Sequence, residues 1–231
     1  MRGTDRMDTA QTPKYPIGHQ DFKKIITEGF VYVDKTRYVH KLAERGGYYF
    51  LSRPRRFGFV YVDKTRYVHK LAERGGYYFL SRPRRFGKSL LISTLYHLFK
   101  GEQALFDGLY IRDQWTFQEY PVIRISFSEI GYREMPLDQA LQQTLDGIAT
   151  HYGLTLKAET PSLTFKALIR ALYEQYQQQV VILIDEYDKP IIDYLDAEQL
   201  HQAKENRDIL KSFYSVIKDA DAYLKLFFIT G

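Results

Sequence analysis

The run Val180–Ile184 constrains the fold of this chain more than any other feature. It consists of five aliphatic residues in succession, Val-Val-Ile-Leu-Ile, and it ends at the acids Asp185 and Glu186. A run of this length is typical of a strand, and a strand that is apolar at every position has to be covered on both of its faces. A parallel sheet with helices on both sides provides that cover, so the run predicts an α/β fold.

The rest of the chain alternates between strand-like and helix-like segments. Further strands are predicted at 78–81, 122–127 and 224–230, and helices at 22–28, 65–72, 88–100, 137–152, 165–177 and 197–217. Alternation of this kind implies right-handed crossover connections between parallel strands. We therefore expect one mostly parallel sheet flanked by helices over residues 16–231, after a disordered tail at residues 1–15.

Residues 30–58 recur letter for letter as residues 59–87. Repeat architectures usually stack three or more units that have diverged, whereas this pair carries no substitution. We interpret it as a recent in-frame duplication or as an error in the assembled sequence. Each copy has seven Lys or Arg and two Asp or Glu, an excess of five positive charges. Without one of the copies the net charge of +5 would be zero. The basic balance therefore gives no support to a nucleic-acid partner.

The composition excludes several other classes of protein. The chain has no cysteine, which excludes disulfides and thiolate metal sites, and its six histidines lack the spacing of metal ligands. The longest apolar runs are too short to cross a bilayer, and the N-terminal residues show no secretory signal. We expect a soluble cytoplasmic protein with no membrane partner.

A phosphate-binding loop of the Walker A type is predicted at residues 82–89, Arg-Pro-Arg-Arg-Phe-Gly-Lys-Ser. A strand that leads through a glycine-bearing turn into a helix points backbone N–H groups at an anion. Lys88 would reach the β- and γ-phosphates of ATP, and the Ser89 hydroxyl would bind Mg²⁺. Arg82 stands where the pattern has its first glycine, and Gly-Lys-Ser alone also fits an ordinary helix start. The residues predicted to bind the nucleotide are Arg84, Arg85, Phe86, Gly87, Lys88 and Ser89.

Only the second copy of the repeat can supply this loop. Gly87 is followed by Lys88 and Ser89, whereas Gly58 is followed by Phe59 and Val60. The first copy therefore lacks both the lysine and the hydroxyl that a phosphate loop uses.

The acids Asp185 and Glu186 stand in the position of a Walker B motif. Asp185 would hold Mg²⁺ together with Ser89, and Glu186 would orient and deprotonate the attacking water. A strand that ends in surface acids is the ordinary alternative for this pair alone. Because the pair follows the loop with one strand between them, the two motifs together favour a P-loop NTPase that uses ATP and Mg²⁺.

Two weaker features follow these motifs. Thr230 ends the last predicted strand, and its hydroxyl could sense the γ-phosphate or position water, although a plain Thr-Gly turn fits equally well. Asp188 and Lys189 follow the acid pair, and they would either form a local ion pair or face the substrate. We favour the ion pair.

With these residues in place, the chain resembles a bacterial family of AAA-ATPase-like proteins from about residue 15 onward. The resemblance rests on Tyr-Val-Asp-Lys-Thr, on Tyr-Phe-Leu-Ser-Arg-Pro-Arg-Arg-Phe-Gly-Lys-Ser ending at Ser89, on Leu-Ile-Asp-Glu-Tyr-Asp-Lys-Pro at 183–190 and on Phe-Ile-Thr-Gly at 228–231. Members often carry a PD-(D/E)XK-type nuclease domain after the ATPase, and their loop normally begins with arginine. Since relatives continue beyond this point, the resemblance implies an AAA-like core truncated at its C-terminus, with the missing strand beside the phosphate-loop strand.

Three interpretations of function remain open at this point. The chain would be a Mg²⁺-dependent ATPase, a nucleotide-dependent switch with little turnover, or an inactive fragment. The switch draws support from the lack of an identifiable arginine finger or lid. The resemblance further implies coupling to a nuclease domain that is absent here, and self-association as in AAA-like ATPases.

Overall fold

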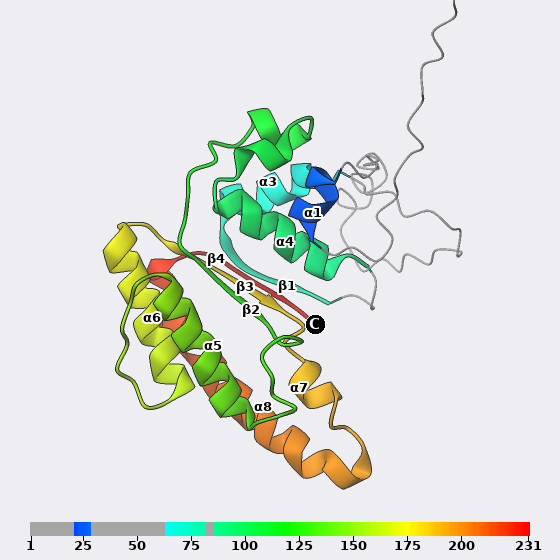
Figure 1. Cartoon of the computed structure of the whole chain (residues 1–231), viewed down its shortest axis with the longest axis vertical. Helices are drawn as coiled ribbons and strands as arrows, with labels where there is room; N and C mark the ends of the chain where they lie inside the picture. The colour runs from blue at the N-terminus through cyan, green and yellow to red at the C-terminus, as the bar shows by residue number, and fades with distance from the viewer. Residues whose placement is uncertain (1–20, 29–62, 82–85) are drawn as a thin grey trace, which may run out of the picture.

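The computed structural model describes residues 21–28, 63–81 and 86–231, which form an α/β structure around one parallel sheet (Figure 1). The strands lie in the order β1-β4-β3-β2, and every neighbouring pair is parallel. Their bounds are Gly76–Leu80 for β1, Val122–Ser126 for β2, Val180–Asp185 for β3 and Leu224–Thr230 for β4. The predicted parallel sheet is confirmed, and each strand begins and ends within two residues of its predicted bounds.

Helices cover both faces of this sheet (Figure 1). One face is covered by α1 (Phe22–Thr27), α3 (Thr65–Arg74) and α4 (Lys88–Phe99). The other face is covered by α5 (Leu137–His151), α6 (Pro161–Tyr176) and α8 (Leu200–Asp219). The short helix α7 (Lys189–Ile192) follows β3, and single 3₁₀ turns complete the connections at Gln103–Phe106, Tyr110–Asp113, Ala197–Gln199 and Asp221–Tyr223. None of the helices in the described part of the chain is both long and apolar enough to cross a membrane.

The position of β3 between two layers of helices explains why residues 180–184 are apolar without interruption. Every one of its residues is buried. Ile182 and Ile184 belong to the core beneath α5, α6 and α8, whereas Val181 and Leu183 belong to the core beneath α4. Because successive side chains of a strand point to opposite faces, both sets have to be apolar when both faces are covered.

Two helices begin at other residues than predicted, and a third was not predicted. The helix predicted to begin at Phe165 begins at Pro161, because the Thr160 hydroxyl accepts a hydrogen bond from the Leu163 amide (3.4 Å) and proline suits the first helical position. The helix predicted at 197–217 is a 3₁₀ turn followed by α8. Helix α7 was not predicted, because four residues carry too little periodicity to be recognised.

Strand β1 lies at the edge of the described sheet, and its side chains on the face of α5, α6 and α8 are exposed. Tyr77 and Phe79 are 49% and 59% exposed. Their rings contact Phe227 and Tyr187, which pack on the core beneath α5, α6 and α8. Among the described strands only β4 pairs with β1. The further strand expected beside β1 stays a prediction.

Several predictions fall on residues that the structure does not describe. They are the tail at 1–15, the first copy at 30–58, and the first half of the phosphate loop with Arg84 and Arg85. These remain predictions from the sequence.

The Asp-Lys-Thr motif of the second copy fastens α3 to the turn at Tyr110–Asp113. Asp63 accepts hydrogen bonds from the amides of Thr65 (2.8 Å) and Tyr110 (3.1 Å), and the Thr65 hydroxyl accepts one from the Ile111 amide (3.2 Å). Both side chains are buried. Buried amides need acceptors, so the motif has a structural role in holding α3 against the turn at Tyr110–Asp113.

The repeat offers a matched test of this role. We expect Asp63→Ala to lower the free energy of unfolding by about 2–4 kcal/mol, because two amides lose their acceptor. The same change at Asp34, the equivalent position of the first copy, should cost less, since the Tyr110 amide donates to Asp63. Urea denaturation of both variants measures the difference, and equal losses would contradict the assignment.

Candidate functional site

The predicted site residues that the structure describes lie at the carboxyl edge of the sheet. Strand register places Thr230 opposite Leu80, which is two residues before the loop, and Asp185 opposite Ser126. The amide of Gly231 also donates to the Leu80 carbonyl (3.3 Å). Figure 1 shows the start of α4, the helix α7 and the end of β4 at this same edge. In open α/β sheets this is the edge at which ligands bind.

Gly87 forms the turn that leads into α4. Its φ of 78° lies in the left-handed region, where glycine is favoured because it has no Cβ. The helix begins immediately afterwards at Lys88. Gly87 has no side chain that could cap the helix, so the first amides of α4 and the positive end of its dipole suit an anionic ligand. Phe86 precedes this turn and is exposed.

Thr230 joins the two acids into one hydrogen-bonded unit. Its hydroxyl donates to Oδ1 of Asp185 (2.5 Å) and accepts from the backbone amide of Glu186 (3.3 Å). The Thr230 carbonyl accepts from the amide of Tyr187 (2.9 Å). Thr230 and Asp185 are both buried. The end of β4 therefore fixes where the acids at the end of β3 are held.

Glu186 adopts a conformation that few residues other than glycine adopt. Its φ is 55°, in the left-handed region. A residue with a Cβ pays about 1 kcal/mol or more for such a conformation, and the cost is often found at functional sites. The chain turns sharply here, because the Glu186 carbonyl accepts from the Lys189 amide (3.1 Å). We call Glu186–Asp188 the acid turn.

Asp185 has the chemistry that a magnesium ligand needs, and Ser89 stays the second ligand that the sequence predicts. Asp185 is 4% exposed, and Thr230 is the only described residue that donates to its carboxylate, which leaves Oδ2 without a donor there. Carboxylate and hydroxyl oxygens are ligands that Mg²⁺ prefers, and the ion usually keeps several waters and phosphate oxygens besides. No cluster of three or more His, Asp or Glu that could hold a metal occurs in the described ranges. A site of two protein ligands does not require one.

Ser126 is a polar neighbour of this site that sequence reasoning missed. It ends β2 opposite Asp185, it is buried, and its hydroxyl is hydrogen-bonded to that of Ser128 (2.9 Å). The signal was the pattern Ser-Phe-Ser at the end of an apolar strand, which resembles the polar ends of β3 and β4.

Lys189 forms an ion pair, although its partner was not the predicted one. Its ammonium donates to Asp193 (2.9 Å), which also accepts from the Tyr132 hydroxyl (2.5 Å) and from Arg133. Burial alone would raise the pKa of Asp193, but the hydrogen bonds from Tyr132, Arg133 and Lys189 outweigh it and lower the pKa to about 2. The ionised Asp193 thus anchors α7 to the loop after β2.

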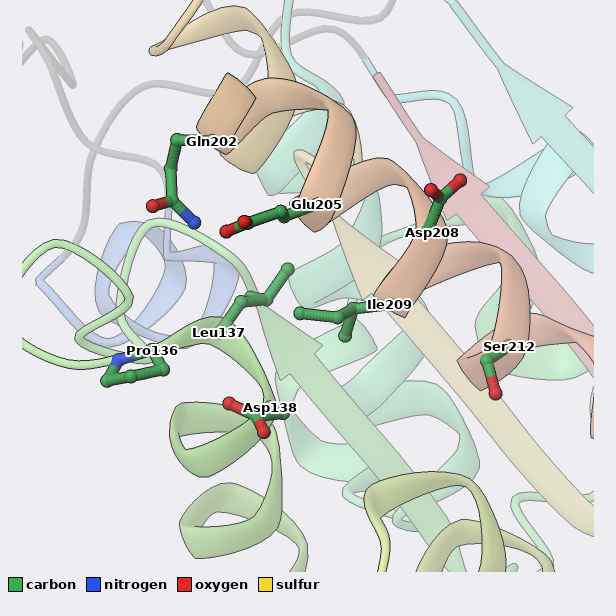
Figure 2. Close-up of a pocket in the computed structure, with 8 residues that line it drawn as sticks. All are labelled: Pro136, Leu137, Asp138, Gln202, Glu205, Asp208, Ile209 and Ser212. Carbon is green, nitrogen blue, oxygen red and sulfur yellow. The ribbon is translucent and has the colours of Figure 1, made fainter. Parts of the chain in front are cut away.

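Two cavities of the described structure are lined by none of the residues that are predicted to bind the nucleotide or the metal. One of about 310 Å³ lies over the loop after β2 and is lined by Ser128, Glu129, Gly131, Tyr132, Arg133, Glu134 and Lys189. The other, of about 610 Å³, lies between the start of α5 and α8 (Figure 2), and its lining is Pro136, Leu137, Asp138, Gln202, Glu205, Asp208, Ile209 and Ser212. The three carboxylates of the second cavity would repel a phosphate.

Comparison with known families identifies one match. The family model described as predicted AAA-ATPase matches residues 16–60 and 58–231. The two matched stretches meet at 58–60, where one copy of the repeat gives way to the other.

A curated relative is similar over most of the chain. It is the "uncharacterized protein in vnfD 5'region" of Azotobacter chroococcum mcd 1, which is 41% identical over 222 residues. The alignment covers 94% of this chain but 37% of the relative, so the chain spans little more than a third of that protein's length. No solved structure was found to match the chain.

The anchoring of α7 by Asp193 predicts a pH dependence of stability. The folded pKa is depressed, so the stabilisation is present above the ordinary value of 3.8 and is lost as the pH falls towards 2. We expect Asp193→Asn to lower the free energy of unfolding at pH 7 by on the order of 1 kcal/mol, since Arg133 is exposed to solvent.

Denaturant unfolding of both proteins between pH 7 and pH 2 measures this effect. The parent and Asp193→Asn curves should converge as the pH falls below about 4. The control is Glu198→Gln, which changes an exposed acid between α7 and α8. This variant should have the same free energy of unfolding as the parent at each pH. A difference that is constant with pH would show that the charge of Asp193 does not matter.

Proposed function

Because this chain belongs to the predicted AAA-ATPase family, we propose that it binds ATP with Mg²⁺ in a P-loop site and hydrolyses it. The observation that carries this proposal is the unit of Asp185, Glu186 and Thr230, held together by hydrogen bonds at the carboxyl edge of the sheet. Strand β4, which supplies Thr230, lies between the strand that leads to the phosphate loop and the strand that bears the acids.

The loop binds the phosphates. Lys88 stands at the first position of α4, where its ammonium and the helix N-terminus both attract the β- and γ-phosphates. Gly87 allows the backbone to come close to the ligand, and Phe86 with Arg84 and Arg85 completes the contacts to the nucleotide. The two arginines add positive charge that attracts an anion.

Ser89 and Asp185 hold the magnesium ion. When it is bound, Mg²⁺ neutralises charge on the phosphate oxygens during transfer. Thr230 donates to one oxygen of Asp185, so the carboxylate is oriented before the ion arrives.

Glu186 acts on water. A carboxylate beside the γ-phosphate can accept a proton from the attacking water and orient it for in-line attack. The hydrogen bond from the Glu186 amide to Thr230 sets the start of the acid turn, so Thr230 contributes to hydrolysis by positioning both acids.

The length of the curated relative supports a wider context for this activity. Since the alignment covers 37% of that protein, we propose that the ATPase core acts on an attached domain, and the family resemblance makes a PD-(D/E)XK-type nuclease the candidate. Self-association as in AAA-like ATPases belongs to the same proposal. Slow turnover at saturating ATP would favour a nucleotide-dependent switch, and absence of ATP binding would favour an inactive fragment.

Lys88→Ala tests the loop. We expect this variant to lose measurable ATP binding by isothermal titration calorimetry, because the phosphates lose the cation that neutralises them. Lys204→Ala, which changes an exposed lysine of α8, should bind ATP like the parent. If Lys88→Ala binds ATP as tightly as the parent, the loop assignment is wrong.

Glu186→Gln tests the base. We expect ATP binding to persist and turnover to fall by about 10²–10⁴-fold, because the amide is isosteric but cannot accept the proton. Phosphate release measures turnover, and retention of labelled ATP on a filter measures the trapped state. The control is Glu205→Gln, an exposed residue of α8. Turnover at the parental rate in Glu186→Gln would assign the base elsewhere.

A further inference from the structure

The hydroxyl of Tyr214 is a buried polar atom that the packing leaves unsatisfied. Tyr214 lies in α8, and its oxygen has no hydrogen-bond partner among the described residues. The ring itself packs edge-on against Phe213 (5.4 Å between centroids), within the core beneath that helix. A phenylalanine would fill the same space without an unpaired hydroxyl, so the oxygen adds nothing to the stability of this conformation.

This hydroxyl belongs to the surroundings of the acid turn. The Tyr214 ring meets that of Tyr187 edge-on at 6.5 Å between centroids, and Tyr187 directly follows Glu186. Burial first, and then Tyr187 and Asp188, raise the pKa of Tyr214 well above its ordinary value. The hydroxyl therefore keeps its proton and remains a hydrogen-bond donor at physiological pH.

Asp188 offers the complementary group. No described residue donates a hydrogen bond to its carboxylate, although its backbone carbonyl accepts from the amides of Ile191 (3.0 Å) and Ile192 (2.9 Å). A buried donor without an acceptor thus packs on Tyr187, the residue that precedes a carboxylate without a described donor, and the two groups are not joined. A phenol and a carboxylate form a charge-assisted hydrogen bond when they meet.

The acid turn lies against the end of β4 in a conformation that is unusual for a residue with a side chain. Glu186 is in the left-handed region, and Tyr187 and Asp188 fill the space that Gly231 leaves by having no side chain. A Cβ on Gly231 would lie 2.4 Å from the Tyr187 ring and 3.1 Å from the Asp188 carboxyl carbon. The turn is therefore strained and rests on the end of β4, beside the proposed γ-phosphate site.

We propose that Tyr214 is a positioning residue for Glu186. In the ATP-bound protein its hydroxyl donates to the Asp188 carboxylate, and this bond holds the acid turn with Glu186 facing the attacking water. The inference rests on the proposed hydrolysis of ATP. It adds a residue of α8, outside the two nucleotide motifs, that acts on the acid turn through Asp188.

Tyr214→Phe separates this role from a structural one. The nucleotide-free variant should unfold at the same temperature as the parent or higher, because no hydrogen bond is lost. Its kcat should fall about 10- to 100-fold, as expected for loss of a hydrogen bond to a charged group, with KM for ATP unchanged. Tyr173→Phe is the matched control, because the Tyr173 ring packs on Tyr223 (5.0 Å between centroids), at the other end of β4 from the acid turn. This variant should change neither the unfolding temperature nor kcat.

Asp188→Asn completes the test as a double-mutant cycle. If the two side chains act through one bond, the double variant should have the kcat of the more affected single variant rather than the product of both losses. Parental kcat in Tyr214→Phe, additive losses in the cycle, or a lower unfolding temperature with raised KM would overturn the inference while Lys88-dependent hydrolysis stands. A parent without Lys88-dependent hydrolysis would overturn the proposed function and the inference with it.

Discussion

Burial of β3 on both faces is the constraint on which the rest of the structure depends. Its side chains enter two separate cores, so helices have to lie on both sides of the sheet. Strands connected through such helices run parallel, and parallel strands end at the same edge. The first polar residues after the apolar run, Asp185 and Glu186, therefore lie beside the ends of β2 and β4. The candidate site follows from how the core is covered.

The sheet could be predicted from the sequence because its signal is local, whereas most contacts that hold the loops could not. Five aliphatic residues in succession identify β3 without reference to any other segment. By contrast, Lys189 pairs with Asp193, and that carboxylate also accepts from Tyr132, which is 61 residues away. No local pattern names such a partner. The early start of α6 was readable from Thr160 and Pro161, and there the capping signal was overlooked.

For the candidate site, the residue types could be predicted from the sequence, whereas their geometry could not. Asp185, Glu186 and Thr230 were each recognisable as polar ends of apolar strands. The hydrogen bonds that join them could not be predicted, because they depend on the register between β3 and β4. This register lets the Thr230 hydroxyl donate to Asp185 and accept from the amide of Glu186. The left-handed φ of Glu186 is likewise invisible in a sequence, since the residue is not glycine. A site of this kind is predicted as a set of residues and becomes a mechanism only with the geometry.

The repeat shows that identical sequence does not confer identical roles. Both copies carry Asp-Lys-Thr and Arg-Pro-Arg-Arg-Phe-Gly, but only the second is followed by Lys88 and Ser89. The hydrogen bonds of Asp63 and Thr65 make the same point within the fold, because the amides of Tyr110 and Ile111 each already donate to the second copy. An amide has one proton to donate, and the protons of these two amides are donated to the second copy. What distinguishes the copies is the chain that follows them, which supplies α4 and the partners of α3.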